Sequence, residues 1–226
     1  MRFELKDVGG NVEYLALDVD TRFEAAMAAL AWARSGDRWV RRIACSGEAA
    51  GPALANMNRF MLPLLRQAAD LDPVPWQDAI DEVCNRFAAA GGVDWFLGGS
   101  AALAVRGAPV RPHDLDLIVS EADSVRVGEL LADGILEPVA RGEWPLSIWW
   151  GRAFLHARVE WAGGMTAAAD QPDVTDFGPT AASLLDTVTW RDWQLRVPPL
   201  HLQRAVSQRR GLADRVAVID ALTASA

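Results

Sequence analysis

The alternation of hydrophobic and polar residues over the first 71 positions predicts a small α+β unit. Phe3 and Leu5 alternate with polar residues, which predicts a strand that turns at Gly9-Gly10-Asn11 and forms a hairpin over residues 1–20. Beyond it the pattern predicts a helix that begins at Asp20 or Thr21, a strand from Arg38 to Ala44, a loop from Ser46 to Pro52 and a helix from Leu54 to Leu71. The sequence leaves the role of residues 1–71 open.

Pro73 and Pro75 stop that helix, and a second predicted unit covers residues 75–165. Its expected elements are a helix from Trp76 ended by Gly91-Gly92, a strand Asp94 to Leu97, a short helix Ser100 to Arg106, a strand Leu115 to Val119, a helix Glu121 to Ala132, and strands at 135–140 and 154–161. Residues 166–226 are predicted to be mostly helical, with helices at 179–188, 199–209 and 212–223 and a strand near Gln194 to Val197.

Composition and charge narrow the class of protein. The longest apolar runs are far too short to cross a bilayer, the start has no secretory pattern, and Cys45 and Cys84 are isolated, so we expect a cytoplasmic protein with reduced thiols. A net charge of −8 argues against broad nucleic-acid binding. Residues 191–215 are the exception, with six arginines and two aspartates. This segment is either a solvated helix face or a site for a small polyanion such as a triphosphate.

Two neighbouring motifs carry the candidate chemistry. Gly98 and Gly99 come where a predicted strand passes into a helix, so the backbone can approach a phosphate there, and Ser100 can cap the helix or donate its hydroxyl to a phosphate oxygen. Asp114 and Asp116 open the next strand, and alternation puts both on one face. Paired carboxylates repel each other unless a cation joins them. The combination predicts phosphoryl or nucleotidyl transfer with Mg²⁺.

A third acid would complete a two-metal site. In the predicted strand 154–161 the odd positions are apolar, so His156, Arg158 and Glu160 share the polar face. Glu160 converges on the aspartates if this strand lies beside theirs, whereas a polar face in solvent is the alternative. Asp176 is the reserve candidate. Four tryptophans flank this strand, and either stack on a substrate ring or fill the core: Trp144, Trp149, Trp150 and Trp161.

Leu97-Gly98-Gly99-Ser100, then Asp114-Leu115-Asp116-Leu117, then one later acid on a strand, resembles the polymerase-beta-type nucleotidyltransferase superfamily. Its small bacterial members include aminoglycoside, lincosamide and abortive-infection toxin nucleotidyltransferases. The resemblance covers residues 76–162 and, more loosely, the C-terminal part. It implies an α+β nucleotidyltransferase fold: a mixed sheet flanked by helices, with the N-terminal unit of residues 1–71 and a mostly helical part over 166–226.

The resemblance also implies site roles. Asp114, Asp116 and Glu160 would be the catalytic and metal-binding acids for two Mg²⁺ ions, with Glu160 either completing the metal site or deprotonating the acceptor hydroxyl. Gly98, Gly99 and Ser100 would hold the β- and γ-phosphates of a nucleoside triphosphate, whose nucleoside monophosphate passes to an acceptor hydroxyl with release of pyrophosphate.

The C-terminal part departs from the family pattern. Relatives commonly carry a phosphate-facing lysine there, whereas this chain has no lysine after Lys6. Arg204, Arg209 or Arg210 would have to replace it, and a guanidinium is not equivalent to an ammonium group. A second hypothesis is therefore a degenerate nucleotide- or partner-binding protein on the same fold.

The acceptor is a separate question. Residues 73–190 hold 17 acids and seven arginines, which favours a small-molecule acceptor over a tRNA, the acceptor expected of a toxin. The two-unit layout makes a homodimer conceivable, and no membrane partner is expected.

Overall fold

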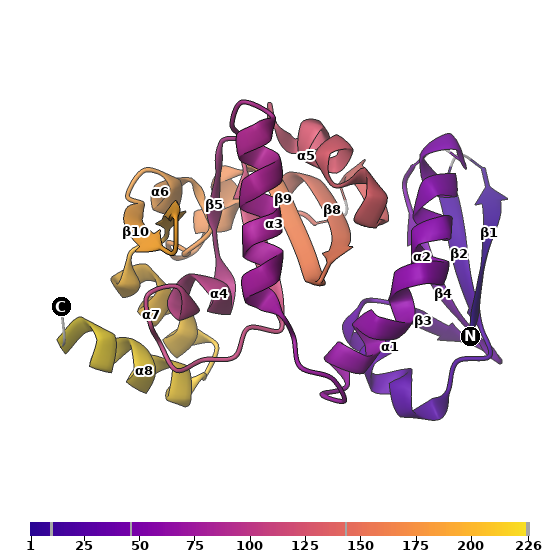
Figure 1. Ribbon diagram of the computed structural model, residues 1–226, viewed down its shortest axis with the longest axis horizontal. Coiled ribbons are helices and arrows are strands. Elements are labelled where there is room, and N and C mark those ends of the chain that lie inside the picture. Colours follow the sequence, from indigo (N-terminus) through magenta and orange to yellow (C-terminus); the bar gives the residue numbers. More distant parts are fainter. Residues whose placement is uncertain (10, 46, 143, 225–226) are drawn as a thin grey trace.

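The computed structural model describes residues 1–9, 11–45, 47–142 and 144–224. The N-terminal unit holds an antiparallel sheet of β1 (Arg2–Val8), β2 (Asn11–Leu17), β3 (Ala33–Ser35) and β4 (Arg38–Ile43), in the order β1-β2-β4-β3. Helix α1 (Glu24–Ala29) follows a 3-10 turn at Thr21–Phe23, and α2 (Gly47–Ala68) packs along β1 (Figure 1). Tyr14, Met27 and Ile43 lie in the buried core of this unit because their strands and helices turn their apolar sides inward.

The sequence predicted most elements of this unit, with two differences. The short strand β3 was not expected, and α2 begins at Gly47, so the predicted loop from Ser46 to Pro52 is wrong for residues 47–52, while Ser46 itself lies outside the described residues. Pro52 lies inside α2, and a proline removes one backbone hydrogen-bond donor from a helix. Burial of Ala50, Ala53 and Met57 along one face of α2 offsets that loss. Gly10, in the predicted hairpin turn, also lies outside the described residues.

The central sheet is mixed and contains five strands in the order β5-β6-β9-β8-β7. These strands are β5 (Trp95–Leu97), β6 (Asp114–Val119), β7 (Ile135–Arg141), β8 (Ser147–Leu155) and β9 (Ala157–Met165). Strands β6 and β9 pair in parallel, and the other neighbours pair antiparallel. The parallel pair is the one feature that brings the start of β6 beside the start of β9.

Two helices cover one face of the central sheet. Helices α3 (Trp76–Ala89) and α5 (Ser124–Leu130) lie on the face that carries Leu115, Leu117 and Trp161. The indole N–H of Trp161, which is fully buried, donates to the carbonyl oxygen of Ser124 at 3.2 Å. The odd-numbered residues of β6 and β9 therefore form the core, and their even-numbered residues project from the opposite face.

The predicted strand 154–161 is wrong because it spans the turn of a hairpin. Strand β8 ends at Leu155 and β9 begins at Ala157, with His156 between them at φ +61°. Apolar residues continue at every second position through the turn, and neither glycine nor asparagine marks it, so the alternation concealed it. His156 consequently does not share the polar strand face with Arg158 and Glu160.

The C-terminal part contains α6 (Pro179–Ala182), β10 (Asp186–Trp190), β11 (Trp193–Val197), α7 (Leu200–Arg209) and α8 (Ala213–Ala224). Strand β11 confirms the strand predicted near Gln194 to Val197. Its hairpin partner β10 was not predicted, and the helix predicted over 179–188 is wrong beyond residue 182. Thr187, Val188 and Thr189 are β-branched, and β-branched residues favour a strand. Trp190 packs against Trp76 of α3 with 6.0 Å between ring centroids.

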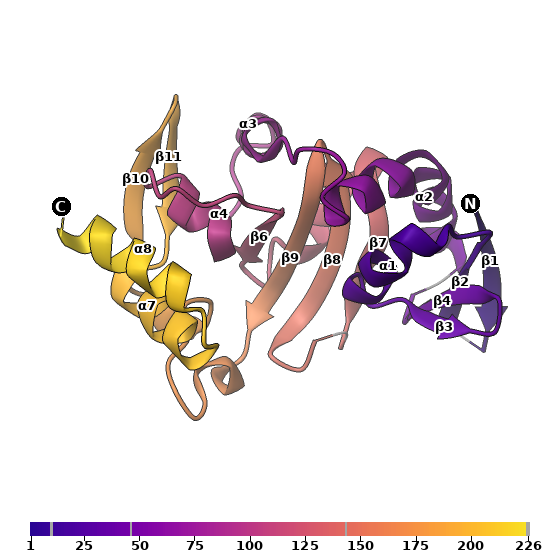
Figure 2. The same ribbon diagram turned by 90° about the horizontal axis from the view of Figure 1, so that it is seen from below.

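The N-terminal unit and the C-terminal helices flank the central sheet at its two edges (Figure 2). Helix α2 contacts both β1 and β7, and Asn56 of α2 donates to the carbonyl oxygen of Ile135 at 3.0 Å. At the other edge, α4 (Gly99–Ala104) contacts β6. None of the described helices is long and apolar enough to cross a membrane.

Adding one methyl group on either side of Trp161 should have opposite effects on stability. A Cβ at Gly151 would overlap the Trp161 ring, so we expect Gly151→Ala to lower the free energy of unfolding by about 1–3 kcal/mol. In Gly128→Ala the new Cβ lies 3.6 Å from the same ring, which is an ordinary contact. Because alanine favours a helix over glycine, we expect this variant to raise the free energy of unfolding by up to about 1 kcal/mol. Urea unfolding of both variants measures the difference. Equal effects would contradict this packing.

Candidate functional site

A row of charged side chains crosses the face of the central sheet that lies opposite α3 and α5. The strand register places Asp116 of β6 beside Glu160 of β9, Glu160 beside Arg152 of β8, and Arg152 beside Glu137 of β7. Acidic and basic groups thus adjoin one another across four strands. The next row toward the start of β6 holds Asp114 beside Arg158, and Arg158 beside Phe154.

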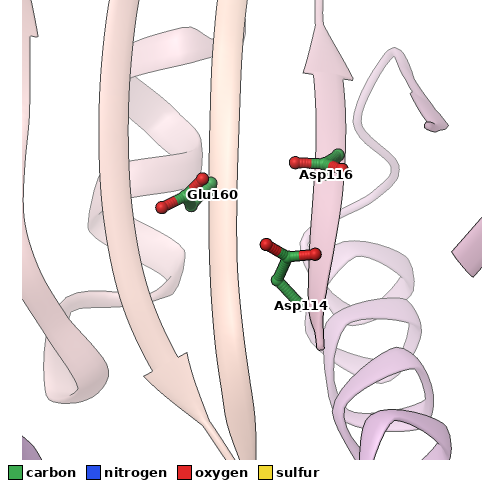
Figure 3. A group of neighbouring side chains, drawn as sticks. All are labelled: Asp114, Asp116 and Glu160. Atoms are coloured by element: carbon green, nitrogen blue, oxygen red, sulfur yellow. The ribbon is translucent and has the colours of Figure 1, made fainter. Parts of the chain in front are cut away.

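The structure brings the three predicted acids together. Asp114 and Asp116 come from β6 and Glu160 from the adjacent β9, and their carboxylate oxygens lie within 4.8 Å of one another (Figure 3). This convergence follows from the parallel pairing of β6 and β9, which sets Glu160 directly opposite Asp116. Carboxylate oxygens in such a cluster can hold a hard divalent cation.

The Gly98-Gly99 turn lies directly against the Asp116 carboxylate. The backbone N–H of Gly98 donates to the carbonyl oxygen of Asp116 at 2.7 Å. Gly99 adopts φ +59°, and a Cβ there would overlap Asp116 Oδ2. The positive φ favours glycine at position 99, and the absence of a Cβ leaves the Asp116 carboxylate in the position that it occupies. Ser100, in the first turn of α4, is half-buried and is not among the residues that line the cavity described below.

Arg152 is the buried partner of two acids. Its Nε donates to Glu160 Oε1 at 2.6 Å, it pairs with Glu137, and its Nη1 donates to the carbonyl oxygen of Leu30 at 3.1 Å. Glu137 in turn accepts from Nη2 of Arg41 on β4, at 2.7 Å. The charged row therefore continues into the N-terminal unit through Leu30 and Arg41.

Arg158 lies between Asp114 and Glu160. It pairs with Asp114, and its Nε lies 3.6 Å from Glu160 Oε1. Burial would raise the pKa of Glu160, but the charges of Arg152 and Arg158 outweigh it and hold that pKa below its usual value. Glu160 is therefore ionised at neutral pH and is a weak proton acceptor, which suits a cation ligand better than a general base.

Asp116 is the acid without an arginine partner. Burial and repulsion from Asp114 and Glu160 raise its pKa to about 7, although the charge of Arg158 acts in the opposite direction. Within the described ranges, no residue donates a hydrogen bond to its carboxylate. A half-buried carboxylate with neither a hydrogen bond nor a counter-ion is costly, and a cation bound by the three acids would remove that cost. The residues present therefore fit a divalent cation.

A cavity of about 530 Å³ lies over this part of the sheet. Asp116 and Glu160 line it together with Gly98 and Gly99. The N-terminal unit contributes Ala31 and Arg41 to its walls, and the C-terminal part contributes Asp176, Phe177, Gln203, Val206, Ser207, Arg210 and Arg215. All three parts of the chain thus meet at the acids.

The two arginines predicted to bind the triphosphate do not line this cavity. Arg204 pairs with Asp220 on α8 at 2.6 Å, and Arg209 donates to the carbonyl oxygen of Val174 at 2.7 Å. Arg210, the third arginine named as a replacement for the lysine, lines the cavity, and so does Arg215, which was not named as a replacement. The lining residues Gln203, Val206, Ser207 and Arg210 follow helical spacing, so they define the face of α7 that meets the site.

Asp176, the reserve acid, also lines the cavity, but it is not one of the three clustered carboxylates. Burial raises its pKa to about 6, against the opposing effects of its own backbone N–H and of Arg210 and Arg215. Sequence reasoning missed Arg152, Arg41 and Gln203. Arg152 had a signal, an arginine two residues before a strongly apolar run, but the strand was predicted to begin after it.

Two of the four flanking tryptophans reach the cavity. Trp144 and Trp150 line it, whereas Trp161 is buried in the core on the opposite face and Trp149 packs under Arg141, 4.4 Å from the guanidinium carbon to the ring centroid. His113, which precedes the acids, is exposed and lies 3.8 Å from Asp70.

Comparisons with known proteins give one structural neighbour. No protein-family model matches the chain, and a search of curated proteins finds no relative. A crystal structure of a Thermotoga maritima protein, provisionally described as a nucleotidyltransferase, superposes with a TM-score of 0.49 and 16% sequence identity. The superposition covers 67% of this chain and 94% of that one.

Removing the shared guanidinium should destabilise the protein strongly. Arg152→Met leaves Glu137 and Glu160 buried without their common partner, and we expect a loss of about 3–5 kcal/mol in the free energy of unfolding. Arg204→Met, which removes an exposed pair, is the control and should change little. Urea unfolding measures both variants. If the two losses are similar, Arg152 does not have the role described.

The cost of the Asp116 charge should appear as a pH dependence in the metal-free protein. Its pKa is raised to about 7 in the folded protein, above the roughly 3.9 of an exposed aspartate. Folding therefore favours the protonated form, and the ionised form opposes folding as the pH rises. We expect Asp116→Asn to be stabilising above pH 7, less so as the pH falls, and neutral below about pH 4.

Urea unfolding at pH 8, 6 and 4 in the presence of a chelator tests this expectation. Asp72→Asn is the control with the opposite sign, because hydrogen bonding from Arg66 lowers the pKa of Asp72. That variant should lose stability at pH 8. A gain from Asp116→Asn that does not depend on pH would contradict the assigned cause.

Proposed function

We propose that the protein is a Mg²⁺-dependent nucleotidyltransferase, which transfers a nucleoside monophosphate from a nucleoside triphosphate to an acceptor hydroxyl. One observation carries the proposal: three carboxylates from two parallel strands converge beside a Gly-Gly turn, and two of them, Asp116 and Glu160, line a cavity.

Different residues of the site would bind the cation and the phosphates. Asp114, Asp116 and Glu160 would hold the cation, which when bound would neutralise phosphate charge and polarise the phosphorus centre. Gly98 and Gly99 leave the backbone beside Asp116 open to phosphate, and Arg210 and Arg215 add positive charge to the cavity lining. The side chains of Arg204 and Arg209 are not part of this arrangement.

The reaction is an in-line displacement at the α-phosphorus. The acceptor oxygen forms a bond to phosphorus, the bond to the bridging oxygen of the β-phosphate breaks, and pyrophosphate leaves with that electron pair. The hydroxyl proton passes to water. Positioning and charge neutralisation by fixed groups would provide most of the rate enhancement.

A small-molecule acceptor fits the cavity better than a tRNA. Ala31 and Arg41 of the N-terminal unit wall the cavity on one side, and its volume of about 530 Å³ matches a nucleotide and a small partner. We propose that residues 1–71 serve to close this side of the site.

A second candidate function is nucleotide binding without catalysis. Its specific support is that Arg158 pairs with Asp114 and Arg152 pairs with Glu160, so two of the three acids already have cationic partners. A cation would have to share or displace these contacts.

Pyrophosphate release with Mg²⁺, each of the four nucleoside triphosphates and a panel of hydroxyl acceptors tests the proposal. We expect Asp114→Asn and Asp116→Asn each to lower turnover roughly 100-fold or more. Asp220→Asn removes a carboxylate outside the cavity and should leave turnover unchanged. Turnover that survives both site variants would refute the mechanism, and calorimetric nucleotide binding without pyrophosphate would favour the second candidate.

A further inference from the structure

An apolar row lies next to the charged row on the same face of the sheet. Ile118 of β6 is opposite Ala162 of β9, which is opposite Trp150 of β8. Each is two residues along its strand from Asp116, Glu160 or Arg152, a separation of roughly 6–7 Å. The two rows therefore present acids and an apolar surface side by side.

Two further aromatic residues border this row. The Trp144 ring lies 6.0 Å from that of Trp150 at 71° and 5.3 Å from that of Phe177 at 46°, measured between centroids and planes. Ile118, Ala162, Trp150, Trp144 and Phe177 all line the cavity, and we call these five residues the ring shelf. They belong to a small apolar cluster separate from the main core.

The ring shelf differs from a core patch in its exposure and its hydrogen bonding. Trp144, Trp150 and Phe177 are half-buried and face the same cavity as the acids. Over the described parts of the chain, no residue accepts a hydrogen bond from the indole N–H of Trp144 or Trp150, whereas the indoles of Trp161 and Trp193 are bonded. A planar ligand with hydrogen-bond acceptors would match both properties.

We propose that the ring shelf binds the base of the nucleoside triphosphate. This inference rests on the proposed function, because the α-phosphorus must lie at the acids and the base is one ribose away from it. The spacing between the charged and apolar rows matches that distance. Phe177 also follows Asp176, which lies near Arg210 and Arg215, so the shelf adjoins the wall assigned to the phosphates.

Stacking on such a shelf is tolerant of base identity, since every base has a flat face. Purines should bind more tightly than pyrimidines because they cover more of the apolar surface. The part of the cavity wall formed by Ala31 and Arg41 is then left for the acceptor.

Calorimetric titration with Ca²⁺ in place of Mg²⁺ tests the shelf without turnover. The probes are ATP, GTP, CTP, UTP and inorganic tripolyphosphate, which has phosphates and no base. We expect Trp150→Ala and Trp144→Ala to weaken ATP binding roughly 5- to 150-fold and to leave tripolyphosphate binding unchanged. Trp150→Phe keeps a ring and should retain most of the affinity.

Trp149→Ala is the matched control, because Trp149 is the adjacent residue of β8, is also half-buried, and is not a lining residue. Thermal unfolding verifies that each variant is folded. Equal losses for ATP and tripolyphosphate, or unchanged ATP affinity with a raised KM for the acceptor, would overturn the base assignment while the proposed function stands. A wild-type protein that binds tripolyphosphate but no nucleotide, or neither of them, would overturn both.

Discussion

The buried pairing of Arg152 with Glu137 and Glu160 is the interaction on which the rest of the site depends. Two carboxylates and a guanidinium lie on one sheet face with little access to solvent. Burying such charges costs several kcal/mol per ion, so the arrangement is tolerable only while each group keeps its partners. Glu160 is consequently fixed in position and stays ionised. Its negative charge repels the neighbouring Asp116 carboxylate and raises the pKa of Asp116.

The same guanidinium explains how the N-terminal unit takes part in a site to which it contributes no motif. Arg152 also donates to the carbonyl oxygen of Leu30, and Arg41 pairs with Glu137, so the end of α1 and strand β4 are bonded to the charged row. Removing these contacts would leave buried polar groups on the central sheet unsatisfied. The N-terminal unit therefore completes the electrostatics of the sheet as well as one wall of the cavity.

The sequence was sufficient to select the three acids as one group, because the alternation of side chains along a strand and the Gly-Gly turn are local properties. Alternation placed Asp114, Asp116 and Glu160 on polar faces, and only the parallel pairing of β6 and β9 remained to be shown. Local patterns could not find the turn at His156, where alternation continues unbroken. They also could not choose among the arginines of α7, because charge counts do not fix helix phase: Gln203 and Ser207 share a face with Arg210 that excludes Arg204 and Arg209.

The distribution of arginines over the three acids has a chemical consequence. Among the residues that the structure describes, Asp114 and Glu160 each have an arginine partner and Asp116 has none. The attraction for a cation is therefore strongest at Asp116. Gly99, which lies against this carboxylate, has no side chain that would cover it. A divalent ion that binds at Asp116 would have to share Asp114 with Arg158, or displace Arg158 from it, to gain that carboxylate as a ligand. Arg158 would then rely on Glu160, 3.6 Å from its Nε, and an anionic phosphate is the partner best able to neutralise the remaining charge. Cation and phosphate binding would thus favour each other, which is the coupling that a nucleotide-binding metal site requires.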